Sequence, residues 1–194
     1  MAVGRPRSFD RDEALKRALE VFWRKGYEAA ALSDLTAAMR INPPSLYATF
    51  GNKEGLFREA LELYAKGRDE VLRQALKAPR ARDAIAELLH ALADSLSDKN
   101  NPQGCFLVRS VNGCESCSDE MKEEILSLRG ASEAAIRTRL RRAKKEKDLP
   151  ASSDPTLLAR YVSTIMQGLG VQAAAGTSRK GLHDIVDVAL TAFP

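Results

Sequence analysis

The sequence has few of the groups that catalysis usually requires. Its 194 residues include only two histidines, three cysteines and one tryptophan. It contains no nucleophile elbow, Walker loop, dinucleotide-binding fingerprint or His-Glu-x-x-His motif. The best remaining enzymatic candidate is a thiol oxidoreductase that uses the Cys-x-x-Cys sequence of Cys114 and Cys117. These absences favour a binding protein over an enzyme, and they give no reason to expect a cofactor.

Long apolar runs are also missing. No uninterrupted run approaches the roughly 18 residues that span a bilayer, and the first ten residues lack the apolar core of a secretory signal. We therefore expect a soluble, cytoplasmic chain with no membrane partner. Three cysteines are an odd number in such a chain, so we expect Cys105, Cys114 and Cys117 to be thiols rather than a disulfide framework.

The composition is that of a folded, mildly basic protein. Apolar residues make up 44% of the chain and charged residues 29%, which is enough apolar surface for one core or two small ones. The formal net charge is +4 and the isoelectric point is near 9.0. This excess is compatible with a polyanionic partner but does not require one.

Apolar residues recur at helical spacing and predict an all-α fold of about nine helices. The first begins after Asp10 and stops at Gly26, and two short ones start at Leu32 and Pro43. A long helix is predicted from Lys53 to about Lys77. Further helices are predicted over about 80–97, 104–113, 119–147, 156–175 and 182–193.

The short helix from Pro43 to Phe50 has an unusual free face. Asn42 can cap it, and prolines at its first two positions remove only amides that have no helical partner. Leu46 and Phe50 lie four residues apart and should face a small core. The outward side then carries small or neutral groups, with no acid between Asn42 and Gly51. Such a face can approach phosphates and bases closely.

Several motifs around this helix resemble one known family. Lys25-Gly26-Tyr27, Leu32 to Leu35, and the run from Ser45 to Glu54 occur in the order and spacing of the DNA-binding domain of TetR-type transcriptional repressors. The resemblance covers about sixty residues. It implies a helix-turn-helix domain over 5–52, and an effector-binding and dimerisation domain over 53–194 that begins with the long fourth helix.

The resemblance also implies roles for individual residues on double-stranded operator DNA. Base contacts would come from the start of the recognition helix, phosphate contacts from its sides and neighbours, and a cationic arm from the N-terminus. The corresponding residues are Arg5, Arg7, Ser33, Asn42, Pro43, Pro44, Ser45, Tyr47, Ala48, Thr49 and Lys53. The arm segment alone is equally consistent with a disordered tail.

Two positions depart from the family pattern. A hydroxyl residue is common at the start of the second helix, where this chain has Ala30 and Ala31, so a cap and a phosphate contact are lost. Glycine is usual at the position of Arg40. If that residue has a positive φ, arginine there costs about 1 kcal/mol.

The body of the chain is predicted to bind a small effector and to dimerise. Helices eight and nine are apolar around more than one face, which predicts a homodimer through this pair. The family resemblance then implies a ligand-released repressor of a near-palindromic operator, with the fourth helix as a lever. Candidate effector-binding residues are Tyr64, His90, Cys105, Phe106, Arg109 and Tyr161.

Some patterns leave alternatives open. The three cysteines, with His90, are also compatible with a thiol- or metal-sensing regulator if folding brings them together. Arg109 could pair with a carboxylate, with an anionic ligand or with solvent. The seven cations between Arg137 and Lys147 are interpreted as favourable charges at a helix C-terminus rather than as the DNA site. His183 is expected at the surface.

Overall fold

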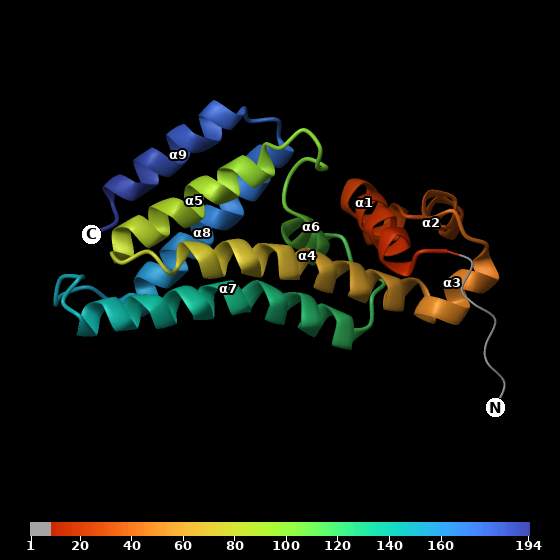
Figure 1. Cartoon of the computed structure of the whole chain (residues 1–194), viewed down its shortest axis with the longest axis horizontal. Coiled ribbons are helices and arrows are strands. Elements are labelled where there is room, and N and C mark those ends of the chain that lie inside the picture. Colours follow the sequence, from red (N-terminus) through yellow and green to blue (C-terminus); the bar gives the residue numbers. More distant parts are fainter. Residues whose placement is uncertain (1–8) are drawn as a thin grey trace.

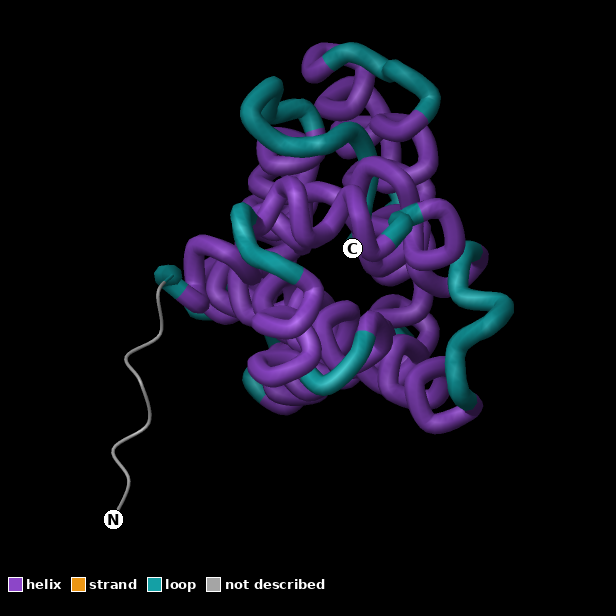
Figure 2. Tube along the Cα trace, turned by 90° about the vertical axis from the view of Figure 1, so that its right-hand side faces the viewer, coloured by secondary structure: helices purple, strands orange, loops and turns teal. Residues whose placement is uncertain are grey.

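The computed structural model describes residues 9–194, apart from the side chains of residues 111 and 112. Over this range the chain forms nine helices and no strand, as predicted (Figures 1 and 2). The helices are α1 (Arg11–Ala29), α2 (Leu32–Met39), α3 (Pro43–Phe50), α4 (Lys53–Ala75), α5 (Ala81–Leu96), α6 (Phe106–Asn112), α7 (Asp119–Lys145), α8 (Pro155–Ala174) and α9 (Arg179–Thr191). None of the described helices is long and apolar enough to cross a membrane.

Side-chain caps define where most helices begin. The Asp10 carboxylate accepts hydrogen bonds from two amides of the first turn of α1. The side-chain oxygens of Asn42, Asn52 and Ser118 cap α3, α4 and α7 in the same way. Gly26 has φ 79° and ψ 172°, so it interrupts the helical geometry inside α1 at the position where the sequence pattern stops.

The first three helices form a small cluster at one end of the molecule (Figure 1). Because α2 and α3 have only eight residues each, their stability comes from packing rather than from their own hydrogen bonds. Leu35 of α2 and Leu46 of α3 are fully buried, and Phe50 is 5% exposed. They meet Phe22 of α1 in the core. The predicted inward face of α3 is therefore confirmed.

Helix α4 leaves this cluster and runs through the body of the molecule, beside α7 (Figure 1). Helix α7 packs along α8, and α5 packs between α4, α8 and α9. The short α6 lies where the body meets α1. Gly170 allows α8 to approach α6 closely, since a Cβ atom there would lie 2.8 Å from the Cβ of Cys105.

An aromatic cluster joins the two parts of the chain. The ring of Phe57, on α4, lies 5.0 Å from Phe22 and 4.9 Å from Tyr27 of α1, and 5.7 Å from Phe106 of α6. Tyr64 continues the cluster, 5.6 Å from Phe106. The three-helix cluster and the body therefore share one continuous core.

Two expectations about individual side chains were wrong. Cys114 and Cys117 form a disulfide rather than two thiols, because a turn between them brings their Cα atoms to 5.2 Å. His183 is not a free surface residue: its Nδ1 lies 2.8 Å from Nδ1 of His90, and its Nε2 lies 2.7 Å from the Asp94 carboxylate. The packing of α9 against α5 creates this contact.

Candidate functional site

Helix α3 presents the face that the sequence predicts. Asn42 Oδ1 accepts a hydrogen bond of 2.9 Å from the Ser45 amide, which fixes the first turn. Tyr47 and Ala48 are exposed, whereas Ser45 and Thr49 are half-buried. Asn42, Pro43 and Pro44 are also exposed. The accessible surface of α3 therefore begins at its N-terminus, where backbone amides add partial positive charge.

Lys53 occupies the first turn of α4, as expected, but its ammonium group folds back on the protein. Its Nζ lies 4.4 Å from the centre of the Tyr27 ring and donates a hydrogen bond of 3.4 Å to the Glu28 carbonyl. Partial burial lowers the pKa of Lys53 below its ordinary value.

The missing hydroxyl at the start of α2 is partly replaced. Ala31 is the N-cap residue and provides no side-chain hydrogen bond. The Asp34 carboxylate accepts the Ala31 amide at 3.2 Å and pairs with Lys25 at 2.7 Å. Ala30 is fully buried, so this position accommodates a small side chain within the core. Ser33 is exposed beside it.

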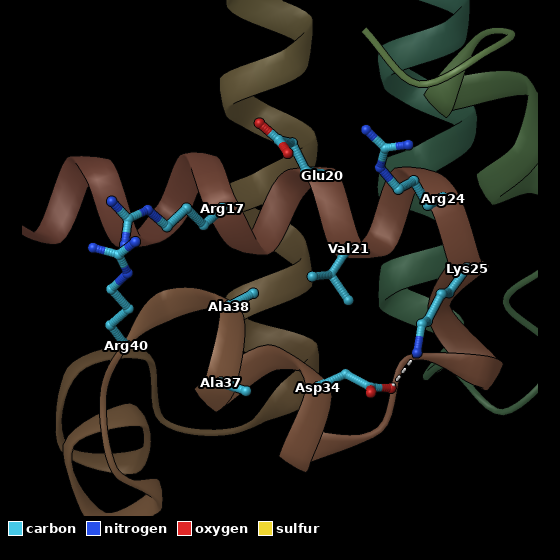
Figure 3. A pocket seen from close by; sticks show the side chains of 9 residues that line it. All are labelled: Arg17, Glu20, Val21, Arg24, Lys25, Asp34, Ala37, Ala38 and Arg40. Carbon is cyan, nitrogen blue, oxygen red and sulfur yellow. Dashed lines mark hydrogen bonds and ion pairs between the residues drawn. The ribbon is translucent and has the colours of Figure 1, made fainter. Parts of the chain in front are cut away.

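Arg40 does have a positive φ, so the condition for the expected backbone cost at this position is met. Its φ is 56° and its ψ is 43°, and it ends α2 in the left-handed conformation. It borders a hollow of about 490 Å³ between α1 and α2, where it points toward Arg17 (Figure 3). The Lys25–Asp34 ion pair closes the other end of the hollow (Figure 3). Arg17 also pairs with Glu13 at 3.1 Å, so part of the charge at this end is balanced.

The basic run from Arg137 to Lys147 lies far from α3. It belongs to the C-terminal half of α7, at the opposite end of the molecule from the three-helix cluster (Figure 1). Arg139 within it is 5% exposed and donates hydrogen bonds to the carbonyl groups of Leu76, Ala78 and Pro79. One of the seven cations is therefore structural and holds the α4–α5 connection.

The body contains a cavity of about 290 Å³ between α4, α5, α7 and α8, and Trp23 of α1 forms part of its wall. Tyr64 lines it, and the Tyr64 hydroxyl donates a 3.4 Å hydrogen bond to the Cys105 sulfur. Burial raises the pKa of the Tyr64 hydroxyl well above its ordinary value. Phe106 is 1% exposed and packs on both Trp23 and Tyr64. The structure therefore brings together three of the six candidate effector residues: Tyr64, Cys105 and Phe106.

The other three candidates lie elsewhere. His90 contacts His183 between α5 and α9. Tyr161 donates its hydroxyl proton to the Ala189 carbonyl at 2.8 Å, which ties α8 to α9. Arg109 is exposed and donates a 2.6 Å hydrogen bond to the carbonyl of Arg24 in α1. Helical periodicity placed these residues on the correct helices, but it did not show which neighbouring helix each would face.

The cavity also contains polar residues that the sequence interpretation missed. Arg68 of α4 and Ser132 of α7 line it, and Arg129 of α7 lines a smaller cavity beside it. A signal for Arg68 was present: it continues the buried stripe of Leu61, Ala65 and Leu72 on α4, so a charge interrupts an apolar face. No sequence pattern indicated that Trp23 lines this cavity, because its helix, α1, was assigned to the helix-turn-helix domain and not to the body.

The structure gives no support to a metal site. Among the residues described, no three His, Cys, Asp or Glu side chains are placed to hold one ion. His90 and Cys105 belong to different contacts, and Cys105 is a buried thiol. The arm residues Arg5 and Arg7 lie outside the described residues, so the predicted arm remains a prediction.

Two family models match the chain. The model described as bacterial regulatory proteins of the tetR family matches residues 14–60. The model described as a tetracyclin repressor-like C-terminal domain matches residues 81–188. The first match contains the α1–α3 cluster and the start of α4. The second contains most of the body.

Several relatives are similar over nearly the whole chain. The HTH-type transcriptional repressor ComR of Escherichia coli (strain K12) is 33% identical, over 98% of this chain and 92% of ComR. A solved structure of the TetR family regulator CifR, a cysteine mutant bound to 26-base-pair operator DNA, is 44% identical. It superposes with a TM-score of 0.93 over 98% of this chain and 100% of that one. A regulator from Rhodococcus sp. RHA1 is 36% identical with a TM-score of 0.65, over 95% of this chain and 100% of that one. The chain therefore belongs to the TetR family of bacterial transcriptional regulators.

Proposed function

We propose that this chain is a repressor that binds a near-palindromic operator as a homodimer and is released by a small-molecule effector. The observation that carries the proposal is the exposed, acid-free face of α3, held by the Asn42 cap and by the burial of Leu46 and Phe50. Asn42, Pro43, Pro44, Ser45 and Ala48 face bases, by shape and van der Waals contact where no polar group is present. Ser33, Tyr47, Thr49 and Lys53 hold phosphates, and Arg5 and Arg7 form the arm.

Single substitutions of two phosphate-binding residues test this interface. Tyr47→Ala is expected to weaken operator binding by tenfold or more, because a hydrogen bond to a charged group contributes about 1.5–3 kcal/mol. Lys53→Ala should weaken binding on every DNA sequence and reduce the slope of log affinity against log salt by about 1. Fluorescence anisotropy with a labelled operator, over a range of salt concentrations, measures both.

Two controls separate this surface from general electrostatics. Lys66→Ala removes an exposed lysine of the same helix about 20 Å further along α4, and it should leave the salt slope unchanged. Neutralising Arg137, Arg141, Arg142, Lys144 and Lys145 should change affinity little, because they lie at the other end of the molecule. If neutralising these five residues greatly lowers operator affinity while Lys53→Ala leaves it unchanged, then our proposal places the DNA on the wrong surface.

The proposed homodimer uses α8 and α9. Leu157 and Val171 of α8 are 64% and 55% exposed, and Val188 of α9 is 70% exposed. Gly168 lies between the first two on the same exposed stripe of α8, with open space at its Cβ position. An apolar stripe with a small residue at its centre permits close packing of a second copy. Two-fold pairing would present two α3 helices to successive major-groove half-sites.

The contacts between the body and α1 support effector control. The Trp23 indole donates a 3.0 Å hydrogen bond to the Gly104 carbonyl, just before α6. Arg109 donates a hydrogen bond to the Arg24 carbonyl, and the Ser116 hydroxyl donates one of 2.8 Å to the Glu28 carboxylate. The hydrogen bonds from Ser116 lower the pKa of the Glu28 carboxyl group, and the one from the Ser116 backbone amide contributes most. A ligand that displaces Trp23 or Tyr64 would therefore act directly on α1 and α4.

A second candidate is a thiol-sensing version of the same repressor. The observation that favours it is Cys105, a buried thiol bonded to Tyr64 in the cavity wall. If oxidation is the signal, replacing Cys105, Cys114 and Cys117 by serine should leave operator binding intact and abolish release by a thiol-selective oxidant. Release of the triple variant at the wild-type oxidant concentration would rule out this version. Anisotropy in matched reduced and oxidised samples makes the comparison.

A further inference from the structure

The polar lining of the body cavity has one sign of charge. The cavity of about 290 Å³ adjoins a much smaller one of about 20 Å³, and both are lined by Arg68, Leu92, Ser132 and Met166. Arg129 and Gln167 line the smaller one, and Tyr64 the larger. No carboxylate lines either cavity. Among the described residues, Arg68 therefore borders the larger cavity and Arg129 the adjoining smaller one, with no acidic side chain in either lining.

Neither arginine is neutralised within the described part of the chain. No acidic side chain forms an ion pair with Arg68 or Arg129, although most other half-buried arginines of the body and of α1, such as Arg11 and Arg58, pair with glutamates. Arg129 Nη2 donates a hydrogen bond to the neutral side chain of Gln167. Both arginines are half-buried, so part of their hydration is lost. A partly desolvated guanidinium group gains most from a charged acceptor.

Apart from Ser95 and Asn101, the rest of the larger cavity is apolar. Leu63, Val71 and Leu88 line it together with Leu92 and Met166, and the Trp23 ring forms part of its wall. The volume lies near the lower end of the range of about 300–1,000 Å³ that is usual for ligand cavities. The space therefore fits a small molecule with an apolar body, whose polar end lies toward Arg68, Arg129, Ser132 and the Tyr64 hydroxyl.

We propose that the effector of this regulator is a small amphipathic anion, a monocarboxylate with an apolar body, whose carboxylate binds Arg68 and Arg129. This inference rests on the proposed effector-controlled function and specifies its ligand. Arg68 provides the main contact, because it borders both cavities. Arg129, held by Gln167, provides the second. A cationic ligand of the same size is excluded by two uncompensated positive charges.

The single tryptophan gives a direct binding signal. Trp23 is the only tryptophan of the chain and lies in the cavity wall, so a bound ligand alters its emission. The probes are octanoate, 1-octanol and octylammonium, which share an apolar chain and differ in the charge of the head group. We expect octanoate to bind the DNA-free protein about tenfold or more tighter than 1-octanol, as for a charge-assisted hydrogen bond. Octylammonium should bind most weakly.

Matched arginine substitutions assign the preference to the cavity. Arg68→Met should remove the advantage of octanoate over 1-octanol, and Arg129→Met should reduce it. Arg73→Met is the control: Arg73 lies on the same helix, is exposed and pairs with Glu70 outside the cavity. It should leave the probe order unchanged. Thermal unfolding of each variant verifies that the fold is intact before binding is compared.

The outcomes distinguish this inference from the proposed function. Binding of 1-octanol as tight as that of octanoate, or no octanoate binding at millimolar concentration, overturns the anionic ligand class, even if a neutral compound releases operator DNA. An octanoate preference that survives Arg68→Met also overturns it. Octanoate binding that depends on Arg68 supports it. Anisotropy measures separately whether octanoate also lowers operator affinity. If octanoate binds but leaves operator affinity unchanged, the result counts against effector control and not against the preference of the cavity for an anion.

Discussion

Replacing Phe57 by alanine is expected to lower the free energy of unfolding by about 3–5 kcal/mol, the usual cost of removing a buried aromatic ring. Phe57 is fully buried and contacts rings from α1 and from α6. The empty space left by the Phe57 ring would lie where the three-helix cluster joins the body. Neither part could fill that space by relaxing alone. Urea unfolding followed by circular dichroism measures the loss, and the melting temperature should fall by about 6–20 °C.

Leu126→Ala provides the control for this loss. Leu126 lies on α7 and is 55% exposed, so its truncation should cost no more than about 0.5 kcal/mol. If Phe57→Ala costs as little as Leu126→Ala, then the aromatic cluster does not join the two parts of the chain. If the Phe57 variant unfolds in two separate transitions, the ring is needed for the three-helix cluster and the body to unfold together, and not only for their stability.

Substituting Ala48 by glutamate is expected to reduce operator affinity by a hundredfold or more. Ala48 is exposed on the acid-free face of α3, and a carboxylate there would oppose the phosphates and the acceptor groups of the bases. Glutamate is a good helix former, so the fold should be unaffected. Anisotropy with a labelled operator measures affinity, and thermal unfolding of the free protein should match the wild type.

Ala48→Gln separates charge from size in this experiment. Glutamine has nearly the shape of glutamate without its charge, so it should cost much less affinity. Equal losses for the two variants would mean that Ala48 packs tightly against a base and that steric exclusion dominates. If neither variant changes affinity, α3 is not the recognition helix and the central proposal is wrong.

The link between effector and DNA follows from where the cavity lies. Trp23 belongs to α1, yet it lines the cavity of the body and is bonded to Gly104. Tyr64 belongs to α4, whose first turn holds Lys53 beside α3. In the proposed function, a ligand between them would contact both helices that support α3. Half-site spacing on the duplex is fixed, so a small displacement of α1 or α4 would be enough to disturb paired binding.

The interface on α3 was more predictable than the cavity, for a physical reason. The helix α3 is defined locally: Asn42, the two prolines, Leu46 and Phe50 determine its start, its buried side and its free side within nine residues. The local pattern also singled out Arg40 as the position where a positive φ would matter, and its φ is positive. A cavity has no such local code, because its walls come from helices far apart in the sequence.

The misplaced residues illustrate this limit. His90, Arg109 and Tyr161 lie on the expected helices, but their partners come from α9, α1 and α9 respectively. Cys114 and Cys117 were expected to be thiols because composition indicates only the compartment, whereas the turn between them decides their distance.

The sequence by itself determined the all-helical fold, the order and approximate bounds of its helices, and the exposed face of α3. Each of these depends on the spacing of apolar residues and on capping groups within a few positions. Only the tertiary structure decided that Trp23 lines the cavity of the body and that Arg68 and Arg129 border it and the adjoining smaller cavity, with no acidic side chain among the described lining residues. Those contacts depend on how α1, α4, α7 and α8 pack, and no local pattern specifies that packing.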